Sequence, residues 1–127
     1  MEWLSQNWLW LAFAVGMVLT VPPFPYAQGY AELSKGIPVI LDEGLSPAER
    51  AAIAFAEVEM REGMLITSGI CGYLGVATGY APTVAAARAQ ALDIARKVYV
   101  PNLRYRNDIG ERVSDESLGC LRQWGYL

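Results

Sequence analysis

Residues 73–98 read YLGVATGYAPTVAAARAQALDIARKV, and this stretch decides the fold class. Its first part, Tyr73–Tyr80, has the composition of a strand, with glycines that let another backbone approach closely. Thr83 then fits the N-cap of a helix from Val84 to Val98, which Pro101 ends. Apolar residues recur through this helix at helical spacing and predict one buried stripe: Val84, Ala87, Ala91, Ile94 and Val98.

Before this stretch the chain predicts short strands joined by turns. Phe13–Thr20 is an apolar run typical of a core strand, and the three prolines of Pro22–Tyr26 end it in an extended loop. Ala27–Lys35 indicates a loop with a turn of helix. Ile37–Leu41 predicts a further short strand, in which Pro38 favours an edge position or a strand start.

The next segment carries overlapping helix and strand signals. Ser46, Pro47 and Glu49 fit an N-cap, a first helical position and an acidic first turn. These residues predict a helix from Pro47 to about Ala54. Ile53–Met60 instead alternates between apolar and polar residues, which is typical of a half-buried strand.

Turns and a terminal helix complete the predicted elements. Arg61–Gly63 predicts a turn and Met64–Thr67 the second arm of a hairpin, while Gly69–Gly72 marks another turn or bulge. A short helix is expected from about Asp115 to Trp124. Four to six short strands with one strong helix predict an α+β fold, a small antiparallel sheet or partial β-barrel with the helix packed on it, forming a single domain over residues 1–127.

The composition predicts a folded domain and excludes several kinds of site. The chain is 54% hydrophobic and has a net charge of −3, which disfavours nucleic acid and anionic membranes as partners. It contains no histidine, which removes the commonest general base and most zinc sites. Cys71 and Cys120 fit no metal or redox spacing. We expect Cys71 to be a small buried side chain in a reducing, cytoplasmic compartment, and a bridge between the two cysteines stays open.

The N-terminal segment is apolar, which allows two interpretations. Trp8–Val21 has no charged residue, and the positive start of a secretory signal is missing because the first basic residue is Lys35. The run is short for a membrane span, which needs about 20 residues. A buried strand is therefore favoured, with a membrane anchor over residues 4–21 as the alternative. Trp3, Trp8 and Trp10 would mark a surface that a partner covers.

The polar segment after the long helix is the main candidate binding site. Arg104 and Arg106 could together grip a phosphate or carboxylate by charge-assisted hydrogen bonds. In the alternative interpretation, an arginine pairs with Asp108 and fastens the loop to the domain. The Pro22–Tyr26 loop, with two aromatic rings, could line a ligand pocket or a domain interface, or could only connect two elements rigidly.

Two other patterns favour structure over chemistry. Glu57 and Glu59 share one face of the predicted strand and could hold a divalent ion, but a solvent-facing strand is the favoured interpretation. The glycines between residues 69 and 79 lie within a strand, which excludes a nucleotide-binding glycine loop. No nucleophile with a base is present, so we predict no catalytic residue and no metal site in this chain.

Five segments, taken in chain order, match the pattern of one family. The first is Phe13–Thr20 followed by Pro22–Tyr26, which is similar to a strand that ends in a Gly-Tyr-Pro loop, and the second is Gly36–Val39, which is similar to a short G-I-P strand. The third combines Thr67–Gly69 with Tyr73–Gly79 and is similar to N-G-G-R-V-L-x-V-T-x-x-G. The fourth is the helix Thr83–Val98, and the fifth is Tyr105–Gly110, which is close to Y-R-x-D-I-G. From about residue 10 to 113 the chain therefore resembles the C-terminal domain of glycinamide ribonucleotide synthetases (phosphoribosylamine–glycine ligases), which are ATP-grasp enzymes.

The chain departs from this family pattern at three places. Pro22–Phe24 stands where Ala/Gly-Gly-Tyr is usual, and Ile70–Cys71 replaces Gly-Arg. The helix that follows Thr83 lacks the usual glutamate. These departures indicate a divergent relative and leave the substrate open.

The resemblance implies a fold of the rudimentary single-hybrid type and a place in purine biosynthesis. Enzymes of this family join an amine to an amino-acid carboxylate through an acyl phosphate, using ATP and magnesium. The domain closes one side of their active site and packs on the ATP-grasp domain, while the magnesium ligands lie upstream. No cofactor and no ligase activity are therefore expected in this chain alone. The residues that would face substrate or the ATP-grasp domain are Pro25, Tyr26, Arg104, Arg106 and Asp108. The alternative is a stand-alone, non-enzymatic module that associates with itself or with another chain.

Overall fold

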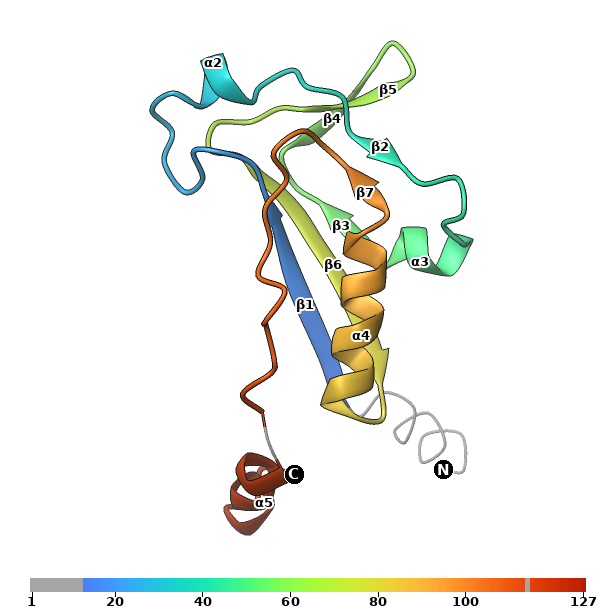
Figure 1. Ribbon diagram of the computed structural model, residues 1–127, viewed down its shortest axis with the longest axis vertical. Helices are drawn as coiled ribbons and strands as arrows, with labels where there is room; N and C mark the ends of the chain where they lie inside the picture. Colours follow the sequence, from blue (N-terminus) through green and yellow to red (C-terminus); the bar gives the residue numbers. More distant parts are fainter. Residues whose placement is uncertain (1–12, 114) are drawn as a thin grey trace.

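The structure, a computed structural model, describes residues 13–113 and 115–127 (Figure 1). The described residues form an α+β fold in which a long helix lies against a small antiparallel sheet. The elements in chain order are β1 Phe13–Thr20, α2 Tyr30–Leu33, β2 Ile40–Leu41, α3 Pro47–Ala51, β3 Ile53–Phe55, β4 Val58–Arg61, β5 Met64–Thr67, β6 Tyr73–Ala81, α4 Val84–Ala95, β7 Val98–Tyr99 and α5 Asp115–Gln123.

The main sheet has three antiparallel strands in the order β1-β6-β3, so the predicted strand at residues 73–80 is its centre. In the pairing of β1 with β6, Val15 lies opposite Gly79 and Val18 opposite Val76. Alternate residues therefore face opposite sides of the sheet. The predicted strands Phe13–Thr20 and Tyr73–Tyr80 are confirmed.

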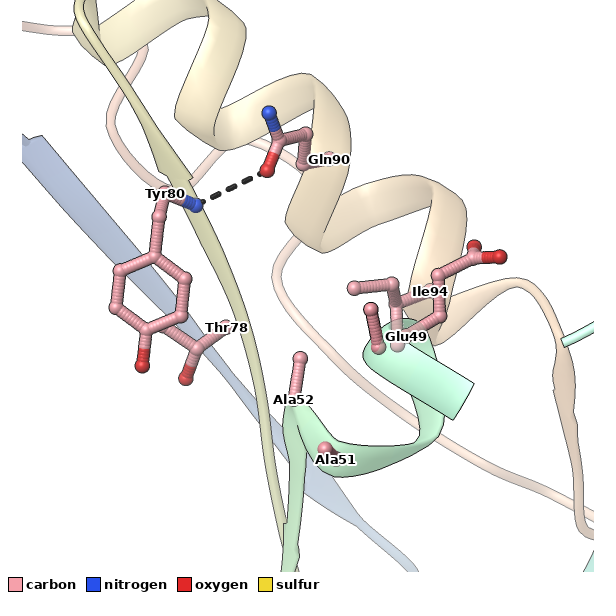
Figure 2. A pocket seen from close by; sticks show the side chains of 8 residues that line it. Glu49, Ala51, Ala52, Thr78, Tyr80, Gln90 and Ile94 are labelled. Carbon is pink, nitrogen blue, oxygen red and sulfur yellow. Dashed lines mark hydrogen bonds between the residues drawn. The ribbon is translucent and has the colours of Figure 1, made fainter. Parts of the chain in front are cut away.

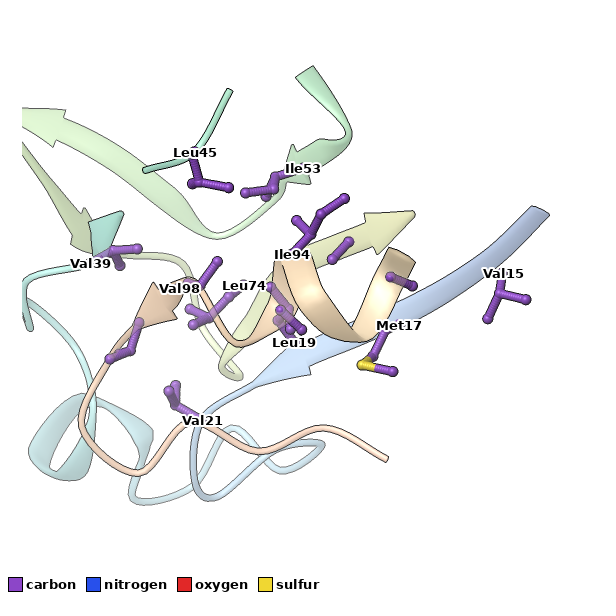
Figure 3. Packing of buried hydrophobic residues seen from close by; sticks show 14 of the residues in the cluster. Val15, Met17, Leu19, Val21, Val39, Leu45, Ile53, Leu74, Ile94 and Val98 are labelled. Atoms are coloured by element: carbon purple, nitrogen blue, oxygen red, sulfur yellow. The ribbon is translucent and has the colours of Figure 1, made fainter. Parts of the chain in front are cut away.

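Helix α4 covers one face of this sheet and closes the core (Figure 3). Val15, Met17 and Leu19 from β1 are buried on that face, and Ala87, Ala91 and Ile94 are buried on the helix. Gly79 allows the close approach, because a Cβ atom there would lie 1.9 Å from the carbonyl oxygen of Ala87. The predicted strand-plus-helix centre and the Thr83 cap are thus confirmed, since Thr83 Oγ1 accepts from the Ala86 N–H at 3.1 Å.

Two small sheets extend the fold beyond the main one. They are β2 with β7 and the hairpin β4 with β5. The segment just before β2 connects them, because Pro38 bridges Ile66 and residues 36–39 exchange backbone hydrogen bonds with β5. The described residues do not close these sheets into a continuous barrel, so the partial barrel is open. The predicted α+β class, with small antiparallel sheets and one main helix, is confirmed.

The C-terminal end of α4 was predicted wrongly. The helix ends at Ala95 instead of Val98, and Val98 pairs with Leu41 in the β2–β7 sheet. Val98 is buried in this strand. An apolar residue at this position fits the helical stripe and the strand equally well, and pairing with β2 decides between them. Similarly, only Ile40–Leu41 of the predicted 37–41 strand forms a ladder.

Both elements that the sequence predicts between residues 46 and 60 are formed, the helix first and strand structure directly after it. The capping box of Ser46 and Glu49 starts α3, in which each backbone N–H donates to the other side chain at 3.1 Å. The helix stops at Ala51, earlier than predicted. The predicted single strand Ile53–Met60 is interrupted at Ala56 and Glu57, whose N–H groups bond to the β6 carbonyls of Leu74 and Tyr73.

Three further predictions concern the ends of the chain and the proline loop. Pro22–Tyr26 forms turns instead of an extended loop, because Phe24 and Tyr26 donate back to the carbonyls of Val21 and Pro23 at 3.0 Å. The terminal helix is confirmed as α5, which has no buried residue and lies apart from the core in Figure 1. The predictions for Trp3, Trp8 and Trp10 fall within residues 1–12, outside the described residues. The alternative anchor over residues 4–21 lies only partly there, and its residues Phe13–Thr20 form β1.

A helix that crosses a membrane must be about 20 residues long and mostly apolar. None of those within residues 13–113 and 115–127 is both long enough and apolar enough to cross a bilayer. The single-domain assignment of residues 1–127 stays a prediction.

Candidate functional site

The predicted site segments meet at the end of β1, where the strand leaves the main sheet. The Thr20 N–H donates to the Arg104 carbonyl at 2.9 Å, and the Arg104 N–H returns a bond to the Thr20 carbonyl at 2.8 Å. On its other side, the Val21 N–H donates to the Gly72 carbonyl at 3.0 Å. The proline loop, the Arg104 segment and the glycine loop at 69–72 therefore lie at one end of the fold.

The proline loop presents an exposed apolar surface at this end. Pro25 and Tyr26 are exposed, and the Tyr26 side chain reaches 70% exposure. The ring of Phe24 contacts that of Tyr73 with centroids 6.3 Å apart, which ties the loop to the start of β6. A ligand or partner role for Pro25 and Tyr26 stays a prediction.

Arg106 and Asp108 pair with each other on the surface. The Arg106 Nε and Nη2 atoms donate to the two carboxylate oxygens of Asp108 at 3.1 and 2.9 Å. This hydrogen bonding lowers the pKa of Asp108. The pair joins two residues of the same loop and does not fasten the loop to the domain. The Arg104 side chain is exposed, and a joint grip of Arg104 and Arg106 on an anion stays a prediction.

The side chain that fastens this loop to the body is Arg88 of α4. Its Nε donates to the Ile109 carbonyl at 2.9 Å, and its Nη2 donates to Glu111 Oε1 at 2.8 Å and to the Asn107 carbonyl. The helical pattern in the sequence gave Arg88 no role. Its partners lie 19 to 23 positions away along the chain, so spacing could not reveal them.

Glu57 forms a site that the sequence did not predict. Its carboxylate accepts hydrogen bonds from the backbone N–H groups of Ile70, Cys71, Gly72 and Tyr73, at 2.7 Å from Gly72 and 3.1 to 3.2 Å for the best bond from each of the others. Cys71 Sγ adds a donor at 3.4 Å from Oε1. Glu57 precedes β4, and Glu59 instead pairs with Arg61. The two glutamates therefore form neither a carboxylate pair nor a solvent-facing row.

These hydrogen bonds set the ionisation of both side chains. Partial burial by itself raises the pKa of Glu57, but the hydrogen bonds from the N–H groups of Ile70, Cys71 and Gly72 together lower it by a larger amount. The pKa of Glu57 therefore lies below its ordinary value. Burial, followed by the bond to Glu57, raises the pKa of the Cys71 thiol. Cys71 is half-buried instead of buried, and it and Cys120 are free thiols.

The hairpin turn in the sequence offered a clue to the contact between Glu57 and residues 70–73. The turn at Glu62 and Gly63 has positive φ at both residues, which pairs β4 with β5 in a short two-residue hairpin. The base of that hairpin brings Glu57 beside Ser68, whose N–H donates to the Glu57 carbonyl at 2.9 Å. A glutamate at the foot of a hairpin that leads into Ser-Gly-Ile-Cys-Gly was therefore the available clue.

Two surface hollows lie near these elements. One of about 460 Å³ is polar and adjoins the glycine loop; its lining includes Lys35, Glu59, Arg61, Ser68 and Gly69. The other, of about 340 Å³, lies between α3, β6 and α4 (Figure 2). There the Tyr80 N–H donates to Gln90 Oε1 at 3.1 Å, and none of the predicted site residues takes part in the lining.

The described residues offer few groups of side chains that could ligate a metal ion. No three His, Cys, Asp or Glu side chains among them lie close enough together to hold a metal ion. The donor set for magnesium that the ligase resemblance implies is therefore not found in residues 13–113 and 115–127.

Comparison with known proteins gives the same resemblance by two routes. A phosphoribosylamine–glycine ligase from Vibrio vulnificus (strain CMCP6) is 28% identical over 99 residues, covering 78% of this chain and 21% of that protein. The crystal structure of phosphoribosylamine–glycine ligase from Thermotoga maritima matches with a TM-score of 0.59 and 32% identity over 75% of this chain. The chain resembles one segment of these ligases in both sequence and structure. No protein-family model matches it.

The extent of the match agrees with the predicted resemblance to a C-terminal domain. The chain spans about a fifth of the length of the phosphoribosylamine–glycine ligases that it matches, 21% in each comparison. Two comparisons, one of sequence and one of structure, therefore give the same family, and the predicted family resemblance is confirmed.

Proposed function

We propose that this chain is the C-terminal module of an ATP-dependent ligase similar to phosphoribosylamine–glycine ligase, and that it serves purine biosynthesis. The observation that carries this proposal is the structural match at 32% identity and a TM-score of 0.59, which covers three quarters of the chain but only 21% of the Thermotoga maritima protein. A match that covers most of this chain and only a fifth of the larger protein is expected if this chain corresponds to one module of such an enzyme.

The module is inactive without the remaining parts of such a ligase. Among the described residues no three His, Cys, Asp or Glu side chains lie close enough together to hold a metal ion. The Cys71 thiol donates to Glu57, but burial and this bond raise its pKa, so the thiol is not activated as a nucleophile. We therefore assign ATP and magnesium to an ATP-grasp portion, in the same or in a separate polypeptide. In this assembly the end of β1 closes one side of the active site, and the residues that face substrate or the ATP-grasp portion are Pro25, Tyr26, Arg104, Arg106 and Asp108.

An uncharged sheet face supports docking on a larger partner. The side of the β1–β6 pair opposite α4 bears only small or uncharged side chains, in register across the two strands: Ala14, Gly16, Val18, Val76, Thr78 and Tyr80. Val18 is 44% exposed and Tyr80 49% exposed. An uncharged patch of this kind marks a surface that another protein covers. In the proposed ligase that protein is the ATP-grasp portion.

The same face supports a second candidate function, a non-enzymatic module that associates with itself. A two-fold symmetric interface brings the same face of two copies together, and an uncharged face meets no electrostatic repulsion from its own copy. The two candidates differ in the occupant of the face, so the composition of the complex in solution separates them.

Light scattering and an ATP-turnover assay test the ligase proposal. The full chain is measured alone and with the gene product encoded immediately upstream. The proposal expects no ligation by the chain alone, a complex with an upstream ATP-grasp protein, and ATP-dependent amide formation by that complex. A stable homo-oligomer that ignores this partner favours the self-associating module, and ligation by the chain alone contradicts the proposal.

A variant on the sheet face makes the assay specific. Val18→Lys places a charge at the centre of the uncharged face and should abolish the complex. Met60→Lys, at a residue of β4 that is 66% exposed and lies outside both that face and the end of β1, is the matched control and should leave the complex intact. We place the chain in the cytoplasm, because both cysteines are free thiols, which a reducing compartment maintains.

A further inference from the structure

The loop Gly69–Tyr73 has the form of an anion-binding nest. Four consecutive backbone N–H groups, from Ile70 to Tyr73, point at one carboxylate. Gly69 and Gly72 have φ values of 72° and 88°, a backbone region that side chains rarely adopt. Alternation of such residues with ordinary ones turns successive N–H groups toward a common point and makes a concave site for an anion.

The anion in this nest is part of the chain itself. The two oxygens of Glu57 share the donors: Oε1 accepts from Ile70 and from the thiol of Cys71, while Oε2 accepts from Gly72 and Tyr73. The Cys71 N–H lies between them, at 3.4 and 3.2 Å. A planar group with two oxygens uses every donor, and therefore the nest fits a carboxylate better than a spherical ion.

The glycines adapt the loop to its occupant. A Cβ atom at Gly69 would lie 2.4 Å from Cγ and Cδ of Glu57, and one at Gly72 would lie 2.5 Å from the Val21 carbonyl oxygen. The loop can therefore wrap around the glutamate only because both positions lack a side chain. The loop backbone surrounds the Glu57 carboxylate on its donor side, and the side chain is partly buried there.

The surroundings of the loop favour negative charge. The polar hollow of about 460 Å³ is lined by Ser68 and Gly69 at the start of the loop, and by the cations Lys35 and Arg61. Arg61 is paired with Glu59, which leaves Lys35 as the cation of the lining for which no carboxylate partner is seen among the described residues. The hollow at the start of the loop therefore holds a cation that attracts an anion to this part of the surface.

We propose that the Gly69–Tyr73 loop is a carboxylate-binding site that this chain fills with its own Glu57. The site takes small monocarboxylates of the size of acetate or propionate once the glutamate side chain is removed. In the wild-type chain, the tethered carboxylate excludes free carboxylates because its effective concentration at the nest is far higher than theirs. This inference is independent of the proposed ligase function.

Chemical rescue of the full chain tests the proposal. Glu57→Ala opens the nest, and Glu59→Ala is the matched control because its carboxylate lies outside the nest. The probe is sodium acetate, with sodium chloride at equal ionic strength as reference. We expect the amide NMR signals of residues 70–73 in Glu57→Ala to shift with acetate and saturate. Near saturation, acetate should raise the melting temperature of this variant by on the order of 5 °C more than that of the wild type.

Several outcomes would overturn this proposal. They are amide signals of residues 70–73 that stay unmoved in Glu57→Ala, or that shift equally in the wild type and in Glu59→Ala. An equal response to chloride would show a general salt effect and would also contradict it. If Glu57→Ala is unfolded in dilute buffer, acetate but not chloride should restore its circular dichroism spectrum. An unfolded variant that acetate leaves unchanged refutes the proposal.

Discussion

Replacing Gly79 by alanine tests the contact between α4 and the centre of the sheet. A Cβ atom at this position would lie 1.9 Å from the Ala87 carbonyl oxygen and 2.7 Å from the Ala91 nitrogen, whereas ordinary contacts begin near 3.4 Å. Both neighbours are backbone atoms, so relief requires a shift of the whole helix by roughly 1.5 Å, the distance by which van der Waals contact is violated. Such a shift opens a gap beneath Ala87 and Ala91, which are fully buried.

The expected loss follows from this displacement. Overpacking a core costs about 1–3 kcal/mol when side chains can adjust. Here the helix backbone must move, and we expect Gly79→Ala to lower the free energy of unfolding by about 3 kcal/mol or more. This is a large fraction of the roughly 5–15 kcal/mol that stabilises a typical domain.

Urea unfolding of the full chain, followed by far-UV circular dichroism, measures the loss. Gly16→Ala is the matched control on the opposite face of the same sheet. Its Cβ meets only Val76 Cγ1, at 3.1 Å, and that half-exposed side chain can rotate. We expect a change within about 1 kcal/mol of zero for this control. A loss below about 1 kcal/mol for Gly79→Ala, or equal losses for the two variants, would refute the packing described for α4.

Three further predictions concern side chains that connect elements. Arg88→Met should speed amide hydrogen exchange over residues 107–111 by about fivefold, because the hydrogen bonds of the Arg88 guanidinium to that segment are lost. Arg106→Met is the control and should leave this exchange rate unchanged. Equal exchange rates in the two variants would contradict the role of Arg88. Thr83→Ala should lower the free energy of unfolding by about 1 kcal/mol through loss of the α4 cap, and Thr83→Ser should keep most of it; a loss shared by both would argue against the hydroxyl. The bond from Lys97 lowers the pKa of Glu49 below 4.5, so its contribution to stability is present above pH 4.5 and is lost as the pH falls through the folded pKa. The difference in unfolding free energy between wild type and Glu49→Gln should therefore shrink in acid, and a difference independent of pH would count against the pair.

The elements predicted from the sequence are those whose signals are local. The β1 and β6 strands, the Thr83 cap and the β4–β5 hairpin each depend on composition, spacing or turn chemistry within a few residues. The capping box of Ser46 and Glu49 likewise marks the start of α3 correctly.

The errors lie where a distant partner decides the structure. Val98 satisfies the helical stripe, but the pairing with Leu41 takes it into a strand. Glu57 continues an alternating pattern, yet the donors of residues 70–73 turn its carboxylate toward the loop. Neither partner is visible in a window of sequence, because both contacts join segments that only the tertiary fold brings together.

In the candidate site, too, the sequence predicted local relations and missed the contacts between distant segments. Sequence reasoning found the polar segment with Arg106 and Asp108, whose pairing needs only a spacing of two residues. It did not find that Arg88 secures this segment from α4, or that the end of β1 brings Arg104 and Gly72 to either side of Thr20 and Val21. These relations depend on the register of β1 in the fold.

The central position of β6 also determines the order in which the chain can assemble. The two strands that pair with β6 differ in their distance from it along the sequence. Ile53 of β3 pairs with Ala77, 24 positions away, whereas Phe13 of β1 pairs with Ala81, 68 positions away. Closing the longer loop costs more entropy, so we expect β3, β6 and α4 to come together first and β1 to join them last. During synthesis β1 would therefore leave the ribosome before the strand that it pairs with, and would wait for that partner. Until then it is an apolar segment that depends on rapid completion of the chain through α4 to avoid aggregation.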